Sequence, residues 1–334
     1  MRVAINGFGR IGKLVFRAFL EQNLKNIEII AINELGSLDS SFHLLRYDSS
    51  HGKLPINITK TKTGLRYKNK NISFYSVRDP KNLPWGKLKI DVVLECSGVF
   101  TSKEKAQNHI NAGAKKVIIS APASNVDATI VQGVNNNILN KKHNIISNGS
   151  CTTNCLAPVA MILDKSVGIN SGFMTTIHSF TGDQRTVDQV HSDLRRARTA
   201  STSMIPTSTG AAKALSLVLP KLKGKLDGTA IRVPTPNVSL IDFTFVSKKK
   251  TSIEIINKAM IAASKTANLK GILSVNNLPL VSIDFNHNSS SSIFDLTQTQ
   301  VLNSNFCRVL SWYDNEWGFS NRMIETMLNF KKLL

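Results

Sequence analysis

The sequence predicts an α/β chain in two parts: a domain built on a parallel sheet, followed by an α+β domain with a mostly antiparallel sheet. Three observations support this prediction. Over residues 1–149, short apolar runs alternate with helical patterns, which is typical of a parallel sheet covered by helices on both faces. Beyond residue 150, strands that alternate apolar and polar residues take over. A chain of 334 residues, 42% of them hydrophobic, can bury two cores.

Five apolar strands are predicted in the first part, at 3–7, 27–34, 91–98, 116–122 and 144–148. A helix follows the first strand, because apolar residues recur at helical spacing from Ile11 to Phe19. A second helical segment occupies 103–114. Residues 55–78 show strand-like alternation around a Thr-Gly turn, and they predict a hairpin excursion from the main sheet.

The second part is predicted to begin with a helix at 151–164 and a strand at 172–178. A polar stretch then runs from Ser179 to Thr207 without sustained periodicity, and a loop of this length in a compact domain is usually functional. The remaining predicted elements are strands at 231–236, 238–247 and 308–316 and helices at 252–266 and 320–332.

Bulk properties narrow the class of protein. No window approaches eighteen uninterrupted apolar residues, so a transmembrane helix is not expected. The first residues lack the apolar run of a signal peptide, and we expect a cytosolic protein. Four cysteines (Cys96, Cys151, Cys155 and Cys307) are too few and too scattered for a disulfide framework. In a reducing compartment a cysteine is either buried and inert or catalytic.

The net charge of +20 suggests a polyanion such as nucleic acid as a partner. A compositional explanation competes with it, because the chain is rich in Asn, Ile, Lys and Ser and carries no recognised nucleic-acid motif. We therefore expect nucleic acid not to be the primary partner. A third interpretation is that some of these cations face anionic small molecules such as phosphate esters.

A glycine-rich turn predicts a dinucleotide site. Gly7, Gly9 and Gly12 follow the first strand and open the first helix, the arrangement of a Rossmann-type domain. The first glycine makes the tight turn, the second admits a pyrophosphate, and the third lets the helix pack on the strand. Glu34 ends the next strand, where a carboxylate accepts hydrogen bonds from a ribose diol and repels a 2′-phosphate. The pattern favours NAD over NADP.

Cys151 follows a predicted strand end and begins a helix, with Ser150 as its predicted cap. That position lowers the pKa of a thiol and suits a nucleophile. Cys155 lies one turn further among apolar residues and is interpreted as structural, because no second Cys/His pair exists to complete a metal site. His178 ends a strand and opens the long loop, so it is either the base that serves Cys151 or a structural histidine.

At this point the motifs, in order, resemble a known family. They are INGFGRIG, YDSSHG, SCTTNC, HSFTGDQ, LRRAR, PTSTGAAKA, RVPTPNVS and SWYDNEWG, and they resemble the phosphorylating glyceraldehyde-3-phosphate dehydrogenases of bacteria from the first strand to the last helix. The resemblance implies that Cys151 attacks the aldehyde, that His178 lowers the Cys151 pKa and takes the proton as hydride leaves to NAD, and that inorganic phosphate then cleaves the thioester.

The resemblance also implies site residues. Those for the C3 phosphate are Thr181 and Arg232, with Asp183 orienting the arginine and Arg196 as a further anion ligand. Those for the attacking phosphate are Ser150, Thr152, Thr209 and Gly210. Those for NAD, beside the three glycines, are Arg10, Ile11, Glu34, Arg78, Ser97, Gly98, Ser120 and Asn315.

The same resemblance implies an organisation and an assembly. Residues 1–149, completed by a C-terminal helix at 315–334, form the NAD-binding domain, and residues 150–314 form the catalytic domain. The loop 179–205 resembles a segment that reaches a neighbouring subunit's cofactor pocket, which implies a homotetramer. No metal is expected.

Three departures from the family pattern are present. Glu34 stands where aspartate is usual, Gly149 where alanine is usual, and Phe319 where tyrosine is frequent. A close relative, erythrose-4-phosphate dehydrogenase, shares INEL, LRR, DFNH and DNEWGF but hydrolyses its thioester. That relative departs from the STGAAK motif, whereas this chain keeps STG at 208–210, which favours glyceraldehyde 3-phosphate as the substrate.

Overall fold

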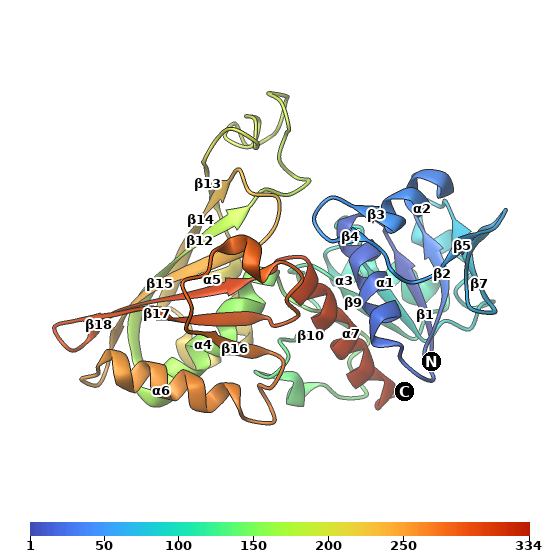
Figure 1. Ribbon diagram of the computed structural model, residues 1–334. Coiled ribbons are helices and arrows are strands. Elements are labelled where there is room, and N and C mark those ends of the chain that lie inside the picture. Colours follow the sequence, from blue (N-terminus) through green and yellow to red (C-terminus); the bar gives the residue numbers. More distant parts are fainter. The chain divides into compact units, whose positions relative to one another are not determined.

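The computed structural model describes residues 1–334, which fold into two compact units (Figure 1). The first comprises Met1–Ile130, Asn136–Gly149 and Ser320–Leu334, and the second comprises Val131–Asn135 and Ser150–Phe319. No helix in the chain combines the length and apolar character needed to cross a membrane.

The first unit is built on a nine-stranded sheet. Its central strand β1 (Arg2–Asn6) pairs in parallel with β2 (Glu28–Asn33) and with β8 (Val92–Glu95). The other strands, outward from β8, are β9 (Lys116–Ile119), β11 (Ile145–Ser147) and β10 (Ala128–Thr129) and, outward from β2, are β7 (Lys70–Tyr75), β6 (Gly64–Tyr67) and β5 (Thr59–Lys60). Pairing is parallel from β10 to β7, so the predicted parallel sheet is confirmed.

The predicted hairpin at 55–78 forms, but it does not leave the main sheet. β6 and β7 pair antiparallel, and β5 and β6 pair antiparallel across the Thr-Gly turn. β7 also pairs in parallel with β2, with Ser73 opposite Ala31. The prediction of an excursion is wrong because the edge of β2 offers unpaired backbone groups, and β7 satisfies them.

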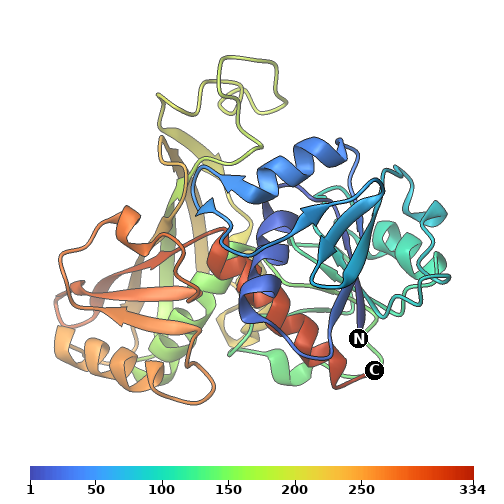
Figure 2. The ribbon, with the colours of Figure 1, turned by 45° about the vertical axis from the view of Figure 1, so that its right-hand side comes forward.

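Helices cover both faces of this sheet. Alternate strand residues Ala4, Val93 and Val117 pack with Trp85 and with Ala106 of α3. Their neighbours along each strand point to the opposite face, because side chains alternate along a strand. Figure 2 shows α1 (blue) and α7 (red) side by side, and Gln22 and Asn321 join them by a 2.7 Å hydrogen bond. The helices are α1 (Arg10–Gln22), α2 (Leu38–Arg46), α3 (Lys103–Asn111) and α7 (Trp317–Lys331), of which α7 has its first three residues in the second unit.

The turn between β1 and α1 is tightly packed at its third glycine. A Cβ placed on Gly12 would lie 2.1 Å from the carbonyl oxygen of Gly7, so any side chain there would force α1 away from the strand. A Cβ on Gly9 would meet nothing within 4 Å. The two glycines therefore differ. Gly12 is required for the close packing of α1 on the turn after β1, whereas Gly9 leaves the space next to its Cα open.

The second unit is a seven-stranded, mostly antiparallel sheet, as predicted. The strands, in spatial order, are β13 (Ile205–Ser208), β14 (Leu226–Val233), β12 (Ile169–Ser179), β15 (Ser239–Ser247), β18 (Phe306–Tyr313), β17 (Ser292–Leu302) and β16 (Leu273–Asn276). Only the β12–β14 and β16–β17 pairs are parallel. β16 and β17 were not expected from the sequence.

Three helices supply the core on this sheet: α4 (Cys151–Ser166), α5 (Ala211–Val218) and α6 (Ile253–Ser264). Leu156 and Val159 of α4 and Met260 of α6 pack with Phe243 and Phe294 of the strands. Figure 1 shows α4 (green) and α6 (orange) along the sheet. The short remaining elements are β3 (Tyr47–Asp48), β4 (Gly52–Lys53) and the 3-10 turns Pro80–Asn82, Asn136–Ile138, Pro220–Leu222 and Ser282–Phe285.

The segment between β12 and β13 is irregular, as its lack of periodicity predicted. It contains no helix or strand apart from an isolated bridge between Arg185 and Thr199. Its apolar side chains Val190 and Leu194 are 89% and 83% exposed. Figure 2 shows the segment (yellow-green) as an irregular loop beyond the ends of β12 and β13.

Replacing Gly12 by alanine is predicted to destabilise the chain by about 1–3 kcal/mol, the usual cost of forcing extra atoms into a packed contact. The added methyl group meets the backbone of Gly7, which cannot move without disturbing β1. Denaturant unfolding of the two variants Gly12→Ala and Gly9→Ala measures the difference. Gly9→Ala is the matched control and should keep the unfolding midpoint; equal midpoints for both variants would contradict the packing argument.

Candidate active site

Cys151 is the first residue of α4, so its sulfur lies at the amino end of that helix. The predicted cap is confirmed: Oγ of Ser150 accepts a 3.0 Å hydrogen bond from the backbone N–H of Thr153. Backbone N–H groups at a helix N-terminus stabilise a negative charge, and they lower the pKa of a cysteine there. The local fold therefore favours thiolate chemistry at this position.

His178 faces Cys151 from the end of β12. Its Nε2 lies 3.5 Å from Sγ of Cys151, within the range of a hydrogen bond to sulfur. The ring is buried, with 4% of its surface exposed, and it meets the ring of Tyr313 edge-on at a centroid distance of 5.9 Å. The structure therefore brings together the two residues that the sequence singled out for catalysis.

The charges around this pair differ from those that the resemblance implied. Burial raises the pKa of the Cys151 thiol, and the Arg232 guanidinium is the strongest influence that lowers it. Burial, reinforced by Arg232, lowers the pKa of His178 to about 3. The imidazole is thus neutral in this arrangement, and the positive charge that acts to lower the Cys151 pKa is that of Arg232 rather than that of His178. A guanidinium in contact with the ring opposes a second positive charge there.

A buried tyrosine that the sequence reasoning missed holds the helix of Cys151 against the strand of His178. The Tyr313 hydroxyl lies 2.9 Å from Oγ1 of Thr152 and 2.8 Å from Oγ1 of Thr176. Thr152 belongs to α4 and Thr176 to β12, so one hydroxyl joins both elements. The motif SWYDNEWG contains Tyr313, but nothing in the motif indicates which groups its hydroxyl meets.

The anion ligands of the long loop are arranged differently from the expectation. Asp183 was expected to orient Arg232, but its carboxylate pairs with Arg196 and lies 3.5 Å from Nε2 of His191. Arg232 instead directs Nη1 to Nδ1 of His178 and to the carbonyl oxygen of Ser179. Arg196 was predicted to be a further anion ligand, and here it forms an ion pair with Asp183.

The expected site for a second anion lies at the start of α5. Gly210 is the N-cap and has no side chain, and Oγ1 of Thr209 accepts a 3.2 Å hydrogen bond from the N–H of Ala211. Backbone amides at such a terminus bind anions. Thr152 was expected to contribute there, but its hydroxyl is bound to Tyr313, so only its backbone remains for that role.

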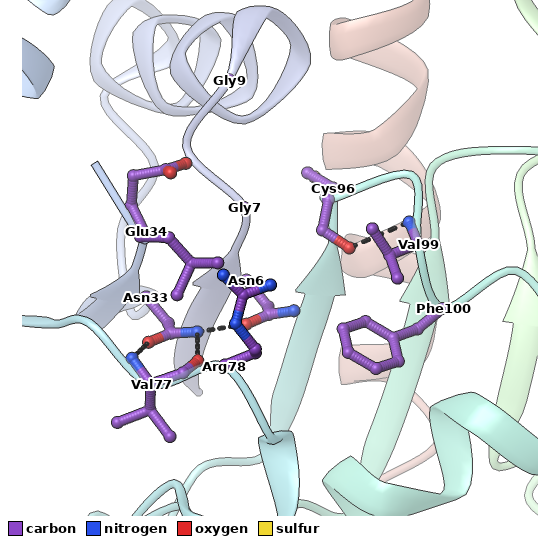
Figure 3. A pocket seen from close by; sticks show the side chains of 12 residues that line it. Asn6, Gly7, Gly9, Asn33, Glu34, Val77, Arg78, Cys96, Val99 and Phe100 are labelled. Carbon is purple, nitrogen blue, oxygen red and sulfur yellow. Dashed lines mark hydrogen bonds between the residues drawn. The ribbon is translucent and has the colours of Figure 1, made fainter.

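In the first unit, a cavity of about 290 Å³ lies beside the glycine turn. Its lining includes five of the predicted cofactor ligands, namely Gly7, Gly9, Glu34, Arg78 and Ser97. Figure 3 shows Gly7, Glu34 and Arg78 beyond the ends of neighbouring strands, with Asn6 and Asn33 hydrogen-bonded to each other. Sequence reasoning missed the other lining residues, which are Asn6, Asn33, Leu35, Val77, Cys96, Val99 and Phe100.

Glu34 is fixed at the edge of this cavity. Its carboxylate accepts hydrogen bonds from the N–H of Phe8 at 2.6 Å and of Gly36 at 3.0 Å. The residues fit a dinucleotide, because Gly9 lines the cavity and a Cβ there would point into open space. A charged acceptor for a ribose therefore stands beside an uncapped helix N-terminus suited to a pyrophosphate.

The remaining predicted cofactor residues do not line this cavity. They are Arg10, Ile11, Gly12, Gly98, Ser120 and Asn315. Arg10 forms an ion pair with Asp48. Asn315 belongs to the second unit, where its Oδ1 accepts hydrogen bonds from the hydroxyls of Ser179 and Ser239, each at 2.9 Å. Two serine donors on Oδ1 fix the orientation of that amide.

Cys155 is fully buried, and burial raises its pKa to about 12, which fits its interpretation as a structural residue. No group of three or more His, Cys, Asp and Glu side chains is placed to hold a metal ion.

Of the departures from the family pattern, Gly149 adopts a φ of +66°, which glycine reaches without strain, so it relieves the turn before Cys151. Phe319 is buried.

Comparisons with known proteins point to a single family. The glyceraldehyde 3-phosphate dehydrogenase NAD binding domain matches residues 1–103, and the glyceraldehyde 3-phosphate dehydrogenase C-terminal domain matches residues 150–315. The chain is 56% identical over 333 residues to glyceraldehyde-3-phosphate dehydrogenase of Xanthobacter flavus, covering 100% of this chain and 99% of the relative. It is 54% identical over 335 residues to the enzyme of that name from Zymomonas mobilis subsp. mobilis, with the same coverage.

Limited alkylation with iodoacetamide near neutral pH is predicted to modify Cys151 and to spare Cys155. Cys151 is partly exposed and Arg232 acts to lower its pKa, whereas Cys155 is buried and stays protonated because its pKa is about 12. Peptide mass spectrometry identifies the modified residue. The variant Cys151→Ser is the control and should leave Cys155 unlabelled; comparable labelling of both cysteines would contradict the assignment.

Replacing Glu34 by alanine is predicted to weaken NAD binding at least about tenfold and to reduce the preference over NADP. The loss of a charged hydrogen-bond acceptor costs about 1.5–3 kcal/mol, and the repulsion of a 2′-phosphate disappears with it. Titration of each variant with both dinucleotides measures the preference. Glu28→Ala, at the other end of β2, is the matched control. An unchanged preference in Glu34→Ala would remove Glu34 from the ribose.

Proposed function

Because the chain belongs to the glyceraldehyde-3-phosphate dehydrogenase family, we propose that Cys151 is the nucleophile and His178 the acid–base group of its reaction. The chain is an NAD-dependent oxidoreductase that oxidises glyceraldehyde 3-phosphate. The observation that carries the proposal is the 3.5 Å contact between Sγ of Cys151 and Nε2 of His178 at the amino end of α4.

The first step is the attack of the Cys151 sulfur on the aldehyde carbon, which forms a thiohemiacetal. Nε2 of His178 lies 3.5 Å from this sulfur, so we infer that it reaches the new hydroxyl, stabilises the oxygen during attack and takes the hydroxyl proton during oxidation. NAD, when bound, supplies the acceptor for the hydride. The carbon is thereby oxidised to a thioester on Cys151, and a thioester retains much of the free energy of the oxidation.

The second step is the cleavage of this thioester by inorganic phosphate, which releases 1,3-bisphosphoglycerate and the free thiolate. We assign the attacking phosphate to the N-termini of α4 and α5, two helices that pack on each other in the second unit. Ser150 and Thr209 contribute hydroxyl groups, and Thr152 and Gly210 contribute backbone N–H groups. This placement is supported by the absence of any side chain at Gly210.

The C3 phosphate of the substrate is assigned to Thr181 and Arg232. Arg232 is a largely desolvated guanidinium with no carboxylate partner, and such a group favours an anion. Arg196 already forms an ion pair with Asp183, so we give it a supporting role in which Asp183 holds it near the phosphate.

NAD is assigned to the first unit, in the cavity beside the glycine turn. Gly7, Gly9, Gly12, Arg10 and Ile11 would surround the pyrophosphate, Glu34 and Arg78 the adenosine half, and Ser97, Gly98 and Ser120 the path toward nicotinamide, with Asn315 binding the carboxamide. We retain 1–149 with the helix 315–334 as the NAD-binding domain and 150–314 as the catalytic domain.

The alternative substrate, erythrose 4-phosphate, is not favoured. The relatives from Xanthobacter flavus and Zymomonas mobilis are named for glyceraldehyde 3-phosphate. The amino end of α5, where the attacking phosphate is assigned, also keeps the STG sequence that the hydrolytic relative lacks.

We further propose a cytoplasmic homotetramer. The loop 179–205 carries apolar side chains, among them Val187, Val190 and Leu194, that are more than two-thirds exposed, and a neighbouring subunit would cover them. Exposed apolar patches of this kind mark protein interfaces. A reducing cytoplasm keeps the Cys151 thiol available for catalysis.

The purified protein is predicted to reduce NAD with glyceraldehyde 3-phosphate in a manner that depends strongly on inorganic phosphate. The variant Cys151→Ser should lose activity by several orders of magnitude and still bind NAD, because the nucleophile is lost while the cavity in the first unit is intact. NADH absorbance measures turnover, and a titration measures binding.

Erythrose 4-phosphate is the comparison substrate in the same assay. Faster turnover with the tetrose and no dependence on phosphate would overturn the assignment of the α4 and α5 N-termini to phosphate. Full activity of Cys151→Ser would overturn the mechanism as a whole.

A further inference from the structure

A buried carboxylate that has no part in the proposed mechanism lies behind the cavity beside the glycine turn. Glu95 is the last residue of β8, only 1% of its surface is exposed, and it does not line the cavity. Its Oε2 lies 2.6 Å from Nδ2 of Asn6 and 2.8 Å from Nε2 of His109. Its Oε1 accepts hydrogen bonds from the backbone N–H of Ser97, at 2.8 Å, and from the hydroxyl of the same residue. Two groups therefore meet each oxygen of this carboxylate.

The indole of Trp85 decides which nitrogen of His109 carries the proton. Nε1 of Trp85 lies 3.0 Å from Nδ1 of His109, and an indole N–H can only donate. Nδ1 is therefore the acceptor in this contact. The ring carries its proton on Nε2 and donates it to Glu95.

The amides on the other side of Glu95 also have only one possible orientation. The N–H of Val77 donates to Oδ1 of Asn33 at 2.9 Å, so Nδ2 of that amide donates to Oδ1 of Asn6 at 2.8 Å (Figure 3). Nδ2 of Asn6 is then the group that faces Glu95. Both ends of this series of hydrogen bonds are groups that only donate, and the series converges on Glu95. Its four donors use every lone pair of the carboxylate, which is therefore ionised.

The residues joined by these contacts form the Glu95 network, which comprises Trp85, His109, Glu95, Ser97, Asn6 and Asn33. Ser97, Asn6 and Asn33 line the cavity, and the other members lie behind it. The glycine turn packs directly on this wall, because a Cβ on Gly7 would lie 2.4 Å from the backbone nitrogen of Ser97. Oγ of Ser97 also accepts a 3.1 Å hydrogen bond from the N–H of Val99, a further lining residue. Glu95 thus fixes, through Ser97, the segment against which the turn rests.

We propose that Glu95 is a positioning residue for NAD, whose carboxylate accepts from both sides and so holds Ser97 and Asn6 in the orientation that the dinucleotide requires. His109 and Trp85 support the carboxylate from behind. This inference rests on the proposed function, because it takes the cavity beside the glycine turn as the site of NAD. Glu95 itself does not touch the dinucleotide, since it is buried and does not line the cavity.

A gain in stability does not account for this carboxylate. Apolar side chains of similar volume stabilise a core as well as a buried charge does, and the core around β8 is otherwise apolar, with Val93 and Val117 on neighbouring strands. What an ionised carboxylate supplies is acceptors on two sides, and a fully satisfied polar network holds its members in a single arrangement. The members that gain from this are those that line the cavity.

Glutamine has the size of glutamate but cannot satisfy the same neighbours, because its amide has only one acceptor oxygen. If its Nε2 faced Ser97, two N–H groups would meet, and the backbone N–H there cannot turn. If its Nε2 faced Asn6, the amides of Asn6 and Asn33 would both have to flip. Asn33 would then present Nδ2 to the N–H of Val77. In either orientation a donor in the cavity wall loses its acceptor.

The variant Glu95→Gln of the full-length protein tests the proposal. The dissociation constant for NAD, measured by calorimetry, should rise about tenfold or more, since a buried donor is left without its acceptor. KM for NAD should rise with it. By contrast, kcat at saturating NAD and KM for glyceraldehyde 3-phosphate should stay within about threefold, because a loss of uniform cofactor binding leaves kcat unchanged.

The matched control is Val93→Ala, which removes two methyl groups from the same buried strand without touching the Glu95 network. This variant should lower the unfolding midpoint measured without NAD and leave the dissociation constant for NAD unchanged. A purely structural role of Glu95 would give the same result in Glu95→Gln.

Two substitutions at Ser97 follow the effect into the cavity wall, and they keep the fold because this side chain is exposed. Ser97→Ala loses the hydroxyl that donates to Glu95 and should weaken NAD binding about threefold or more. Ser97→Thr keeps a hydroxyl there and should bind NAD like the unmodified protein. In the double variant Glu95→Gln/Ser97→Ala the two losses should not add, because both break the same contact.

The direction of the hydrogen bonds is tested by ¹⁵N NMR of the unmodified protein labelled at histidine, with His109→Gln to identify the resonances. Nε2 of His109 should carry the proton and Nδ1 should be bare, with and without NAD. If Glu95→Gln does not fold, this spectrum and the two Ser97 variants still decide.

Three results would overturn the inference: unchanged NAD binding in Glu95→Gln or in Ser97→Ala, an equal loss of NAD binding in Val93→Ala, or a proton on Nδ1 of His109. The variant Glu34→Ala tells which idea fails. If it weakens NAD binding while Glu95→Gln does not, only the role of Glu95 is refuted. If neither variant changes NAD binding, the cavity is not the site of NAD, and the proposed placement of the cofactor fails.

Discussion

The catalytic roles that we propose for Cys151 and His178 depend on holding one sulfur atom against one ring nitrogen, although the two belong to different elements. Cys151 begins α4 and His178 ends β12, and the 3.5 Å contact persists only if helix and strand keep their relative position. Tyr313 provides that constraint at close range, since its buried hydroxyl bonds Thr152 on the helix and Thr176 on the strand. Packing of α4 on the sheet through Leu156 and Phe243 provides it over a longer range.

Burial around this contact disfavours positive charge on His178, so the cation beside the ring has a strong influence on the site. The ring of His178 stays neutral because it is desolvated and because Arg232 already supplies a cation beside it. The chain holds 42 lysines and arginines, and most of that charge says nothing about the reaction. Arg196, Arg198 and Arg308 each meet a carboxylate. Nη1 of Arg232 meets a ring nitrogen and a carbonyl oxygen instead, and this position, rather than the net charge, supports our assignment of Arg232 to a phosphate.

Much of the fold could be predicted from the sequence because its signals are local. The glycine turn and the apolar spacing of α1 lie within residues 5–19, and both reflect contacts between neighbouring residues. β17 escaped prediction because Asp295 interrupts its apolar pattern; this carboxylate accepts a hydrogen bond from Nε1 of Trp312 on the adjacent strand. α2 escaped because only Ser41 and Leu45 are buried along it, too few to mark a helical face. A contact between residues that are far apart in the sequence leaves no local sequence pattern.

In the site, too, the sequence indicated which residues take part but not which partners they contact. Motifs located Cys151, His178 and Arg232 but could not say that Asp183 would choose Arg196 or that Arg232 would turn to His178. Both arrangements depend on how the irregular loop between β12 and β13 lies beside β14. The ion pair between Asp183 and Arg196 accounts for both. Because Asp183 pairs with Arg196, Arg232 has no carboxylate partner. Its Nη1 contacts Nδ1 of His178 and the carbonyl oxygen of Ser179 instead. The guanidinium that we assign to the C3 phosphate is therefore in contact with the ring that we assign to acid–base catalysis.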